Sequence, residues 1–259
     1  TGQISSLSVQ GMYMYSHQAY SLSDSTHEFD HFYNVARLSV RHSVSFLRKL
    51  KLLTGMDGNY QTARSDSAYG HKLRNRNGQA LFSSLQYHPH KRLGLQLFFR
   101  EDLIDGQFSP IQWCVGTQWD IIDRISIIAN FSRNHRVPSL NDLYWQPGGN
   151  PDLIPESGLS YETGLRYSGS SSNSMVSCGV TWFDSWINDM IVWRPGIGSI
   201  WSPLNQKKVH SRGIEADLKM NTGFRSWLFS AVINYNWVRA TIESSDRWSA
   251  GTEGKLLTN

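Results

Sequence analysis

The residues that could perform nucleophilic catalysis are not placed to do so. Ser16 and His17 are neighbours in the sequence, and so are His210 and Ser211, yet neighbouring residues of a strand point to opposite faces. The chain also lacks the Gly-x-Ser-x-Gly motif that presents a nucleophilic serine at a strand-to-helix turn. We therefore predict that the protein is not an enzyme.

Side chains that could hold a metal are equally sparse. His88 and His90 lie where a turn is expected, but no third ligand stands at a spacing typical of a zinc site. Asp184 and Asp189, considered as a carboxylate pair, offer no stronger signal. We favour exposure to solvent for the two histidines, and we predict neither a metal nor a cofactor.

The better candidates are side chains that bind a ligand without reacting with it. Aromatic rings supply apolar surface and amides supply placed hydrogen bonds, which is the combination that binding sites usually use. Both kinds occur in the polar connections between strand-like runs. The predicted ligand contacts are Tyr144, Trp145, Trp193, Trp201 and Trp248, with Asn141 and Asn150 as polar partners. The alternative, that the rings pack on one another, stays open for each of them.

Composition narrows the class of protein without deciding it. The 259 residues are 39% hydrophobic with a mean hydropathy of −0.41, and no run approaches the roughly 20 apolar residues that a membrane helix needs. The net charge of +4 is modest and the basic residues are scattered, so we expect no nucleic-acid partner. Cys114 and Cys178 lie within strand-like runs, where lone thiols usually pack as small apolar groups, and a disulfide between them stays open. Composition suits a membrane β-barrel and a soluble β-sandwich equally.

Apolar and polar residues alternate along most of the chain. A period of two predicts strands with one apolar and one polar face, because successive residues of a strand point to opposite sides. The clearest apolar face is formed by Trp227, Phe229, Ala231, Ile233, Tyr235 and Trp237. The same register predicts that Leu95, Phe131, Val180, Ala216 and Phe229 face outward, and that Gln96, Asn130, Glu215 and Asn234 face inward. We expect an all-β chain of about eleven strands and the start of another.

The connections between the expected strands alternate in length. Short ones are expected at Phe46–Lys49, His88–Arg92, Ile122–Arg124, Ser168–Asn173 and Thr222–Arg225. Long ones are expected at Ser21–Asp30, Ser65–Asn77, Leu140–Gly158, Pro195–Gln206 and Ser244–Glu253. Long antiparallel strands with short turns at one end and long loops at the other are typical of an outer-membrane barrel, and aromatic residues near the strand ends fit its two girdles.

The expected connection at Leu140–Gly158 and the residues just before it contain four prolines. Pro138, Pro147, Pro151 and Pro155 each remove a backbone donor and restrict φ, so we expect neither a sheet ladder nor a helix to run through them. The pair Gly148–Gly149 permits positive φ, and Asn-Pro favours a turn. We predict a strand end, a stiff loop and a new strand.

Three linked motifs in this region resemble the TonB-dependent outer-membrane receptors. They are the Arg-x-Pro stretch of Arg136–Tyr144, the Gly-Asn-Pro stretch of Gly149–Glu156 and the Tyr-Glu-x-Gly stretch of Tyr161–Gly164. Downstream, Ile187–Ile191 and Arg212–Glu215 are similar to two further strands of that family. The residues that carry the resemblance are Arg136, Pro138, Gly149, Asn150, Pro151, Pro155, Glu156, Tyr161, Glu162, Gly213 and Glu215.

The resemblance implies a fold and a function. It implies that residues 1–259 are part of an antiparallel transmembrane β-barrel, about 11–12 of 22 strands, without the plug domain and the closing strands. It implies an outer-membrane receptor of a Gram-negative bacterium that imports a ferric siderophore, haem or cobalamin with energy from TonB. The implied partners are that ligand, the TonB complex through the plug, and membrane lipid with lipopolysaccharide. Two alternatives stay open, namely a passive porin or barrel enzyme, and a soluble all-β carbohydrate-binding module.

Overall fold

The computed structural model describes residues 4–21, 28–46 and 49–244. Within these residues the chain folds into one antiparallel sheet of twelve strands. The strands are β1 (Ile4–Ser21), β2 (Glu28–Phe46), β3 (Leu50–Ser65), β4 (Leu73–His90), β5 (Leu93–Ile104), β6 (Gln107–Phe108), β7 (Gln112–Ile122), β8 (Ile125–Arg136), β9 (Glu156–Ser170), β10 (Ser174–Pro195), β11 (Trp201–Phe224) and β12 (Trp227–Ser244). The predicted fold class is confirmed, with eleven long strands and the two-residue β6.

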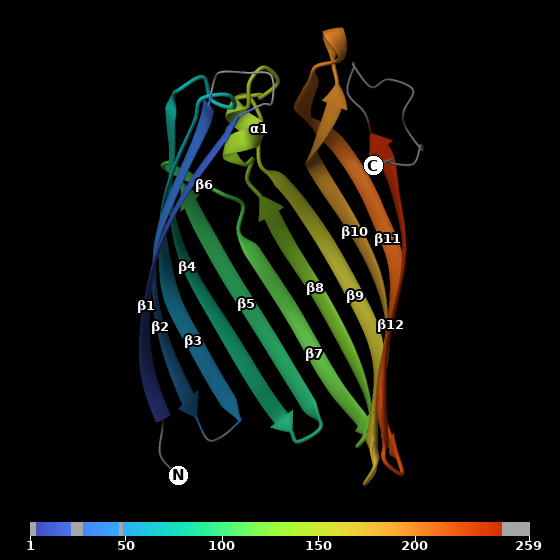
Figure 1. The fold of residues 1–259 in the computed structure, drawn as a ribbon. Coiled ribbons are helices and arrows are strands. Elements are labelled where there is room, and N and C mark those ends of the chain that lie inside the picture. Colours follow the sequence, from blue (N-terminus) through green and yellow to red (C-terminus); the bar gives the residue numbers. More distant parts are fainter. Residues whose placement is uncertain (1–3, 22–27, 47–48, 245–259) are drawn as a thin grey trace.

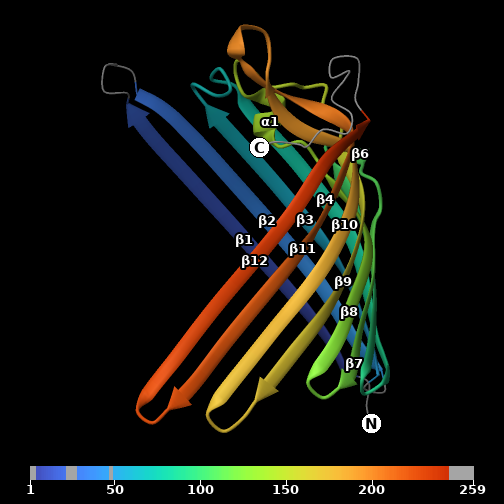
Figure 2. The same ribbon diagram turned by 90° about the vertical axis from the view of Figure 1, so that its right-hand side faces the viewer.

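The strands follow one another around the sheet in sequence order, except that β6 pairs only with the end of β5. The sheet is bent into a trough, with β1 and β12 at its two edges (Figures 1 and 2). None of the helices among the described residues has the length and apolar character to cross a membrane. Between the two edge strands, backbone groups are paired by ladders between neighbouring strands.

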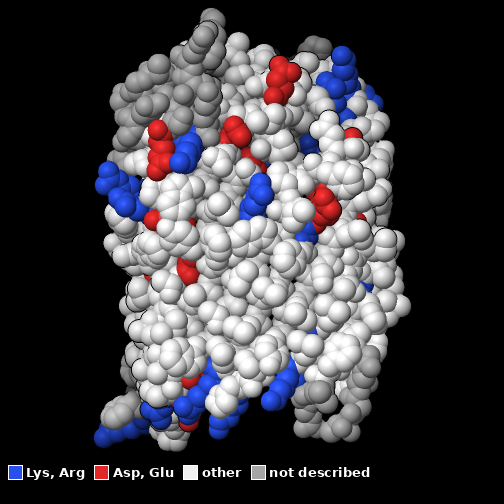
Figure 3. Space-filling model, turned by 180° about the vertical axis from the view of Figure 1, so that it is seen from behind, with Lys and Arg blue, Asp and Glu red and all other residues white. Residues whose placement is uncertain are grey.

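The two faces of the sheet differ as the alternation predicts. Cross-strand partners run from Leu95 through Thr117, Ala129 and Thr163 to Trp182, so these residues share one face. The five residues predicted to face outward all lie on this apolar face, and the four predicted to face inward lie on the other. Seen from behind, a band across the lower half of the molecule carries almost no charged side chains, which lie above and below it (Figure 3).

The connections also alternate in length around the sheet. Short turns at 91–92, 123–124, 171–173 and 225–226 lie at one end, and the longer connections 66–72, 137–155 and 196–200 lie at the other. Two predicted loops were too long, because β4 already begins at Leu73 and β11 at Trp201. The predicted connections near 21–30 and 244–253 fall largely outside the described residues.

Two helical segments in the long connections were not predicted. They are α1 (Leu140–Tyr144) and a 3-10 turn at Ile197–Ser199. The first has only five residues, too few for a helical period to show in the sequence. Its signal was instead the capping box, in which the Ser139 hydroxyl accepts from the Asp142 backbone and the Asp142 carboxylate accepts from Ser139.

Two glycines leave room for aromatic rings that pack against them from the neighbouring strand. Gly55 and Phe82 are cross-strand partners on β3 and β4, and Gly213 and Phe183 are partners on β11 and β10. A Cβ on Gly55 would lie 2.7 Å from the Val40 carbonyl oxygen. A Cβ on Gly213 would lie 2.6 Å from the Phe183 ring. Each ring covers the backbone of a glycine, an arrangement that permits local bending of a sheet.

We expect Gly213→Ala to destabilise the full-length protein by about 1–3 kcal/mol, because the added methyl group meets the Phe183 ring and backbone that cannot move away. The matched control is Gly58→Ala, since a Cβ there would have its nearest neighbour at 4.0 Å. Thermal unfolding followed by circular dichroism compares the two variants. Equal unfolding temperatures would show that the glycine is not needed for packing.

Candidate ligand-binding site

The connection between β8 and β9, residues 137–155, forms a strap across the mouth of the trough. It leaves the sheet after Arg136 and rejoins it at Glu156, which are cross-strand partners. Its helix α1 lies among the long connections at the upper end in Figure 1. The contacts below show that the strap reaches β3 and β4 on one side and β10 and β11 on the other. A segment joining these two walls can only cross the concave side, which identifies the polar face as the inner one.

A buried carboxylate fastens the base of the strap. Glu156 Oε1 accepts a hydrogen bond from the backbone nitrogen of Ile191 at 2.6 Å and another from the Arg136 guanidinium. Arg136 also donates to the Ile191 carbonyl oxygen. The same carboxylate therefore joins β8, β9 and β10. Arg136 of the first motif and Glu156 of the second are thus brought together, in a structural role.

A second buried carboxylate holds the helix of the strap. Asp142 caps α1 through Ser139, accepts from the Trp193 indole nitrogen at 2.9 Å, and lies 3.6 Å from the Arg136 guanidinium. Burial by itself would raise the pKa of this carboxyl. The hydrogen bonds from Ser139 and Trp193 and the positive charge of Arg136 outweigh burial, so the pKa of Asp142 lies below its ordinary value.

The strap packs against the first wall through an aromatic cluster. Leu140 is buried with Ala63 and Tyr69, and the Tyr69 hydroxyl donates to Asn141. Burial raises the pKa of Tyr69 above its ordinary value, which favours the protonated hydroxyl that donates to Asn141. The Arg74 guanidinium lies 4.0 Å above the centre of the Tyr144 ring.

Amide side chains join the strap to the second wall. Asn150 Nδ2 donates to the Pro203 carbonyl oxygen at 3.1 Å. Asn205 donates to the Ile154 carbonyl oxygen at 3.0 Å and accepts from the Ile154 backbone nitrogen at 3.1 Å. The Trp145 and Trp193 rings meet edge to face with centres 5.6 Å apart. The strap is therefore tied to both walls and holds one shape.

The structure brings together most of the residues predicted to contact a ligand. Tyr144, Trp145, Asn141, Asn150 and Trp193 all lie on or against the strap. Of the predicted rings, Trp201 is the most open, at 54% exposed, and Trp248 lies outside the described residues. Asn141 and Asn150 are already engaged in hydrogen bonds within the protein.

Several residues that hold this site were missed by sequence reasoning, among them Tyr69, Arg74 and Asp142. Tyr69 and Asn141 are 72 positions apart, and nothing in either local pattern indicates that they meet. Of the remaining motif residues, Tyr161 lies on the outer face, where its ring contacts those of Trp182 and Trp186. Glu215 lies on the inner face, as predicted, and Glu162 lies on the same face.

Charged side chains of β2, β3 and β5 lie on the inner face of the sheet. Arg100 makes ion pairs with Asp57 at 2.7 Å and with Asp102 at 2.9 Å. Beside them a pocket of about 450 Å³ is bordered by the exposed guanidinium groups of Arg37 and Arg41. Among the described residues no group of His, Cys, Asp and Glu is arranged to hold a metal ion.

A curved antiparallel sheet with an apolar outer face, a charged inner face and a loop fastened across its mouth defines the wall and vestibule of a β-barrel. A model of the family described as TonB dependent receptor-like, beta-barrel, matches residues 4–259. The chain therefore belongs to the TonB-dependent receptor family, and the resemblance seen in the motifs is confirmed.

Relatives by sequence include two vitamin B12 transporters named BtuB. The chain is 28% identical over 197 residues to BtuB of Vibrio vulnificus, which is 73% of this chain and 31% of that protein. It is 28% identical over 152 residues to BtuB of Photobacterium profundum, which is 57% of this chain and 24% of that protein. The chain thus spans about a third or less of the length of these relatives.

Solved structures share the fold. The copper transporter OprC superposes with a TM-score of 0.69 at 18% identity, covering 93% of this chain and 44% of that one. The siderophore receptor PirA of Pseudomonas aeruginosa superposes with a TM-score of 0.67 at 15% identity, covering 94% of this chain and 54% of that one. Likeness at this identity concerns the fold alone.

We expect Asp142→Asn to loosen the strap at neutral pH by about 1.5–3 kcal/mol, because hydrogen bonds to a charged acceptor are lost. Since the folded pKa of Asp142 is depressed, its stabilising contribution is present above the unfolded pKa, about 3.9, and is lost as pH falls through the lower folded pKa. Hydrogen exchange of residues 137–155 at neutral and acid pH measures both effects. Asp152→Asn, an exposed change on the same strap, is the control and should exchange as the unaltered protein does.

Proposed function

We propose that the chain forms wall and vestibule of an outer-membrane receptor, in a Gram-negative bacterium, that binds a scarce ligand and imports it with energy from TonB. The strap is the observation that carries the proposal. A long loop held in one shape offers rigid ring surface at the mouth, where a bulky ligand must first dock. Membership of the family favours this function over a passive porin, a barrel enzyme and a soluble carbohydrate-binding module.

Cobalamin is the first ligand to test, because the sequence relatives at 28% identity are vitamin B12 transporters. Ferric siderophores come next, because PirA, which shares the fold, is a siderophore receptor. Haem completes the proposed set. Coupling to TonB would pass through a plug domain inside the barrel, facing the charged inner wall.

The test uses the full-length gene in a Gram-negative host that lacks its own cobalamin receptor. We expect radiolabelled cyanocobalamin to enter these cells, and to enter only when the host also makes TonB. Parallel assays with a ferric siderophore and with haem compare the ligand classes. A correctly assembled receptor that takes up none of the three would contradict the proposal, and uptake without TonB would favour a passive pore.

Tyr144 and Trp145 test the proposed vestibule. In the intact receptor, replacing both by Ala should raise the dissociation constant for cyanocobalamin at least tenfold, about 1.4 kcal/mol, because rigid ring surface is removed. Binding is measured on cells and divided by the amount of folded receptor. Trp119→Ala, which removes an exposed ring from the outer face, is the control. Unchanged affinity in an assembled double variant would remove both residues from the site, and leave them a packing role under Arg74 and Trp193.

Labelling of single cysteines on the two faces tests the membrane location. In a variant without Cys114 and Cys178, single cysteines at Leu95, Phe131, Val180, Ala216 and Phe229 should react with a bilayer-soluble thiol reagent. Cysteines at Gln96, Asn130, Glu215 and Asn234 should not, because the register places them on the opposite face. Mass spectrometry of the intact receptor in vesicles counts the labels. Equal labelling of the two sets would contradict the barrel.

A further inference from the structure

Two arginines stand at the upper edge of the apolar band on the outer face. On β12 the outward residues from Trp227 to Trp237 are uncharged, and the next outward residue is Arg239. On β11 the outward residues from Thr222 to Ile214 are uncharged, and the next is Arg212. Arg212 and Arg239 are direct cross-strand partners. The band therefore ends on both strands at a pair of like charges.

Neither arginine of this pair has an ion-pair partner among the residues that the structure describes. Both side chains are exposed, and neither forms an ion pair or a side-chain hydrogen bond with any described residue. Asp184, the partner of Arg212 on β10, is bonded to His210 at 2.6 Å, and Glu243 pairs with Lys208 at 2.9 Å. Like charges directly opposite one another are destabilising, so an anion from outside the protein would stabilise this part of the sheet.

The height of the pair matches a membrane boundary. Arg239 stands twelve positions after Trp227, which is about 40 Å along a strand at about 3.3 Å per residue. With the tilt of about 45° usual in barrels, the pair lies about 28 Å above the short turns, near the edge of a band about 25 Å tall. The outer face in Figure 3 likewise carries its upper charges above an uncharged band.

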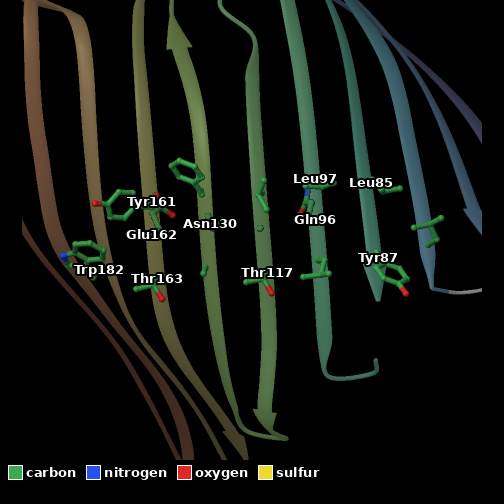
Figure 4. A pocket seen from close by; sticks show the side chains of 16 residues that line it. Leu85, Tyr87, Gln96, Leu97, Thr117, Asn130, Tyr161, Glu162, Thr163 and Trp182 are labelled. Carbon is green, nitrogen blue, oxygen red and sulfur yellow. The ribbon is translucent and has the colours of Figure 1, made fainter. Parts of the chain in front are cut away.

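Aromatic rings surround the space beneath the pair. Trp182 pairs with Ile214, which precedes Arg212 on the same face of β11. Tyr161 lies between Trp182 and Trp186, with ring centres 5.5 and 5.3 Å apart. A groove of about 690 Å³ continues from there across the outer face, and its floor includes the small side chains of Thr117 and Thr163 (Figure 4). The lining is almost wholly apolar, which suits a hydrocarbon chain.

We propose that Arg212 and Arg239 bind the phosphate of a membrane lipid, with its acyl chain running past Trp182 into this groove. The guanidinium groups supply two planar donors for phosphate oxygens, and the groove supplies apolar surface directly below. The occupant is a lipid of the leaflet next to the long connections. The proposal goes beyond ligand import and rests only on the proposed membrane location.

The test is lipid titration of the detergent-solubilised full-length receptor, followed by native mass spectrometry. The probes are phosphatidic acid, diacylglycerol with the same acyl chains, and inorganic phosphate. We expect phosphatidic acid to bind at least tenfold more tightly than diacylglycerol, and inorganic phosphate not to displace it. The variant R212Q/R239Q should lose this preference.

Two further variants serve as controls for charge and for assembly. R37Q/R41Q removes the same charge from the inner face and should keep the preference. R212K/R239K keeps the charge at the pair and should retain most of the preference even if the glutamine variant fails to assemble. Equal lipid preference in the unaltered receptor and an assembled R212Q/R239Q, or equal loss in R37Q/R41Q, would overturn the proposal. Displacement by inorganic phosphate would overturn the lipid as the occupant.

Discussion

The arrangement of the mouth depends on one buried carboxylate. Glu156 begins β9, pairs with Arg136 at the end of β8, and accepts from the backbone of Ile191 on β10. Three neighbouring strands are thereby joined where the nineteen residues of the strap leave and re-enter the sheet. A buried carboxylate is costly unless its oxygens are bonded, so this geometry is strongly determined. The direction of the strap across the trough follows from that junction.

The contacts of the strap also explain how a proline-rich loop keeps a single shape. Proline reduces the entropy of the unfolded loop but removes backbone donors, so side chains must do part of the bonding. Asp142, Asn150 and Asn205 do so, each bonding to backbone or to a ring nitrogen on another segment. The rings of Tyr144 and Trp145 are then placed by contacts with opposite walls. The two rings therefore form a preorganised surface at the mouth.

The alternation along the strands gives the two faces of the sheet different chemistry. The inner face pairs its charges, as in the Arg100 bridge between Asp57 and Asp102, and keeps other guanidinium groups open to the interior. The outer face is apolar over its middle and collects rings and charges at its upper edge, including Arg212 and Arg239. One face therefore suits a protein or ligand inside the trough. The other suits lipid, with a defined place for a headgroup.

The sequence by itself determined the strands, their faces and the family. Period-two alternation is a local property that a strand imposes on each residue, so Leu95 and Gln96 could be assigned to opposite faces without a structure. The motifs around Pro138 and Pro151 likewise identified the strap, because turn and proline chemistry act over a few residues. The sequence missed α1, whose single turn is too short for a period, and placed two strand starts too late. Only the tertiary structure decided which side chains meet across the mouth. The curvature of the sheet brings together three pairs, namely Tyr69 with Asn141, Arg74 with Tyr144, and Asp142 with Trp193. This curvature results from many strands together, so no single segment of the sequence predicts it.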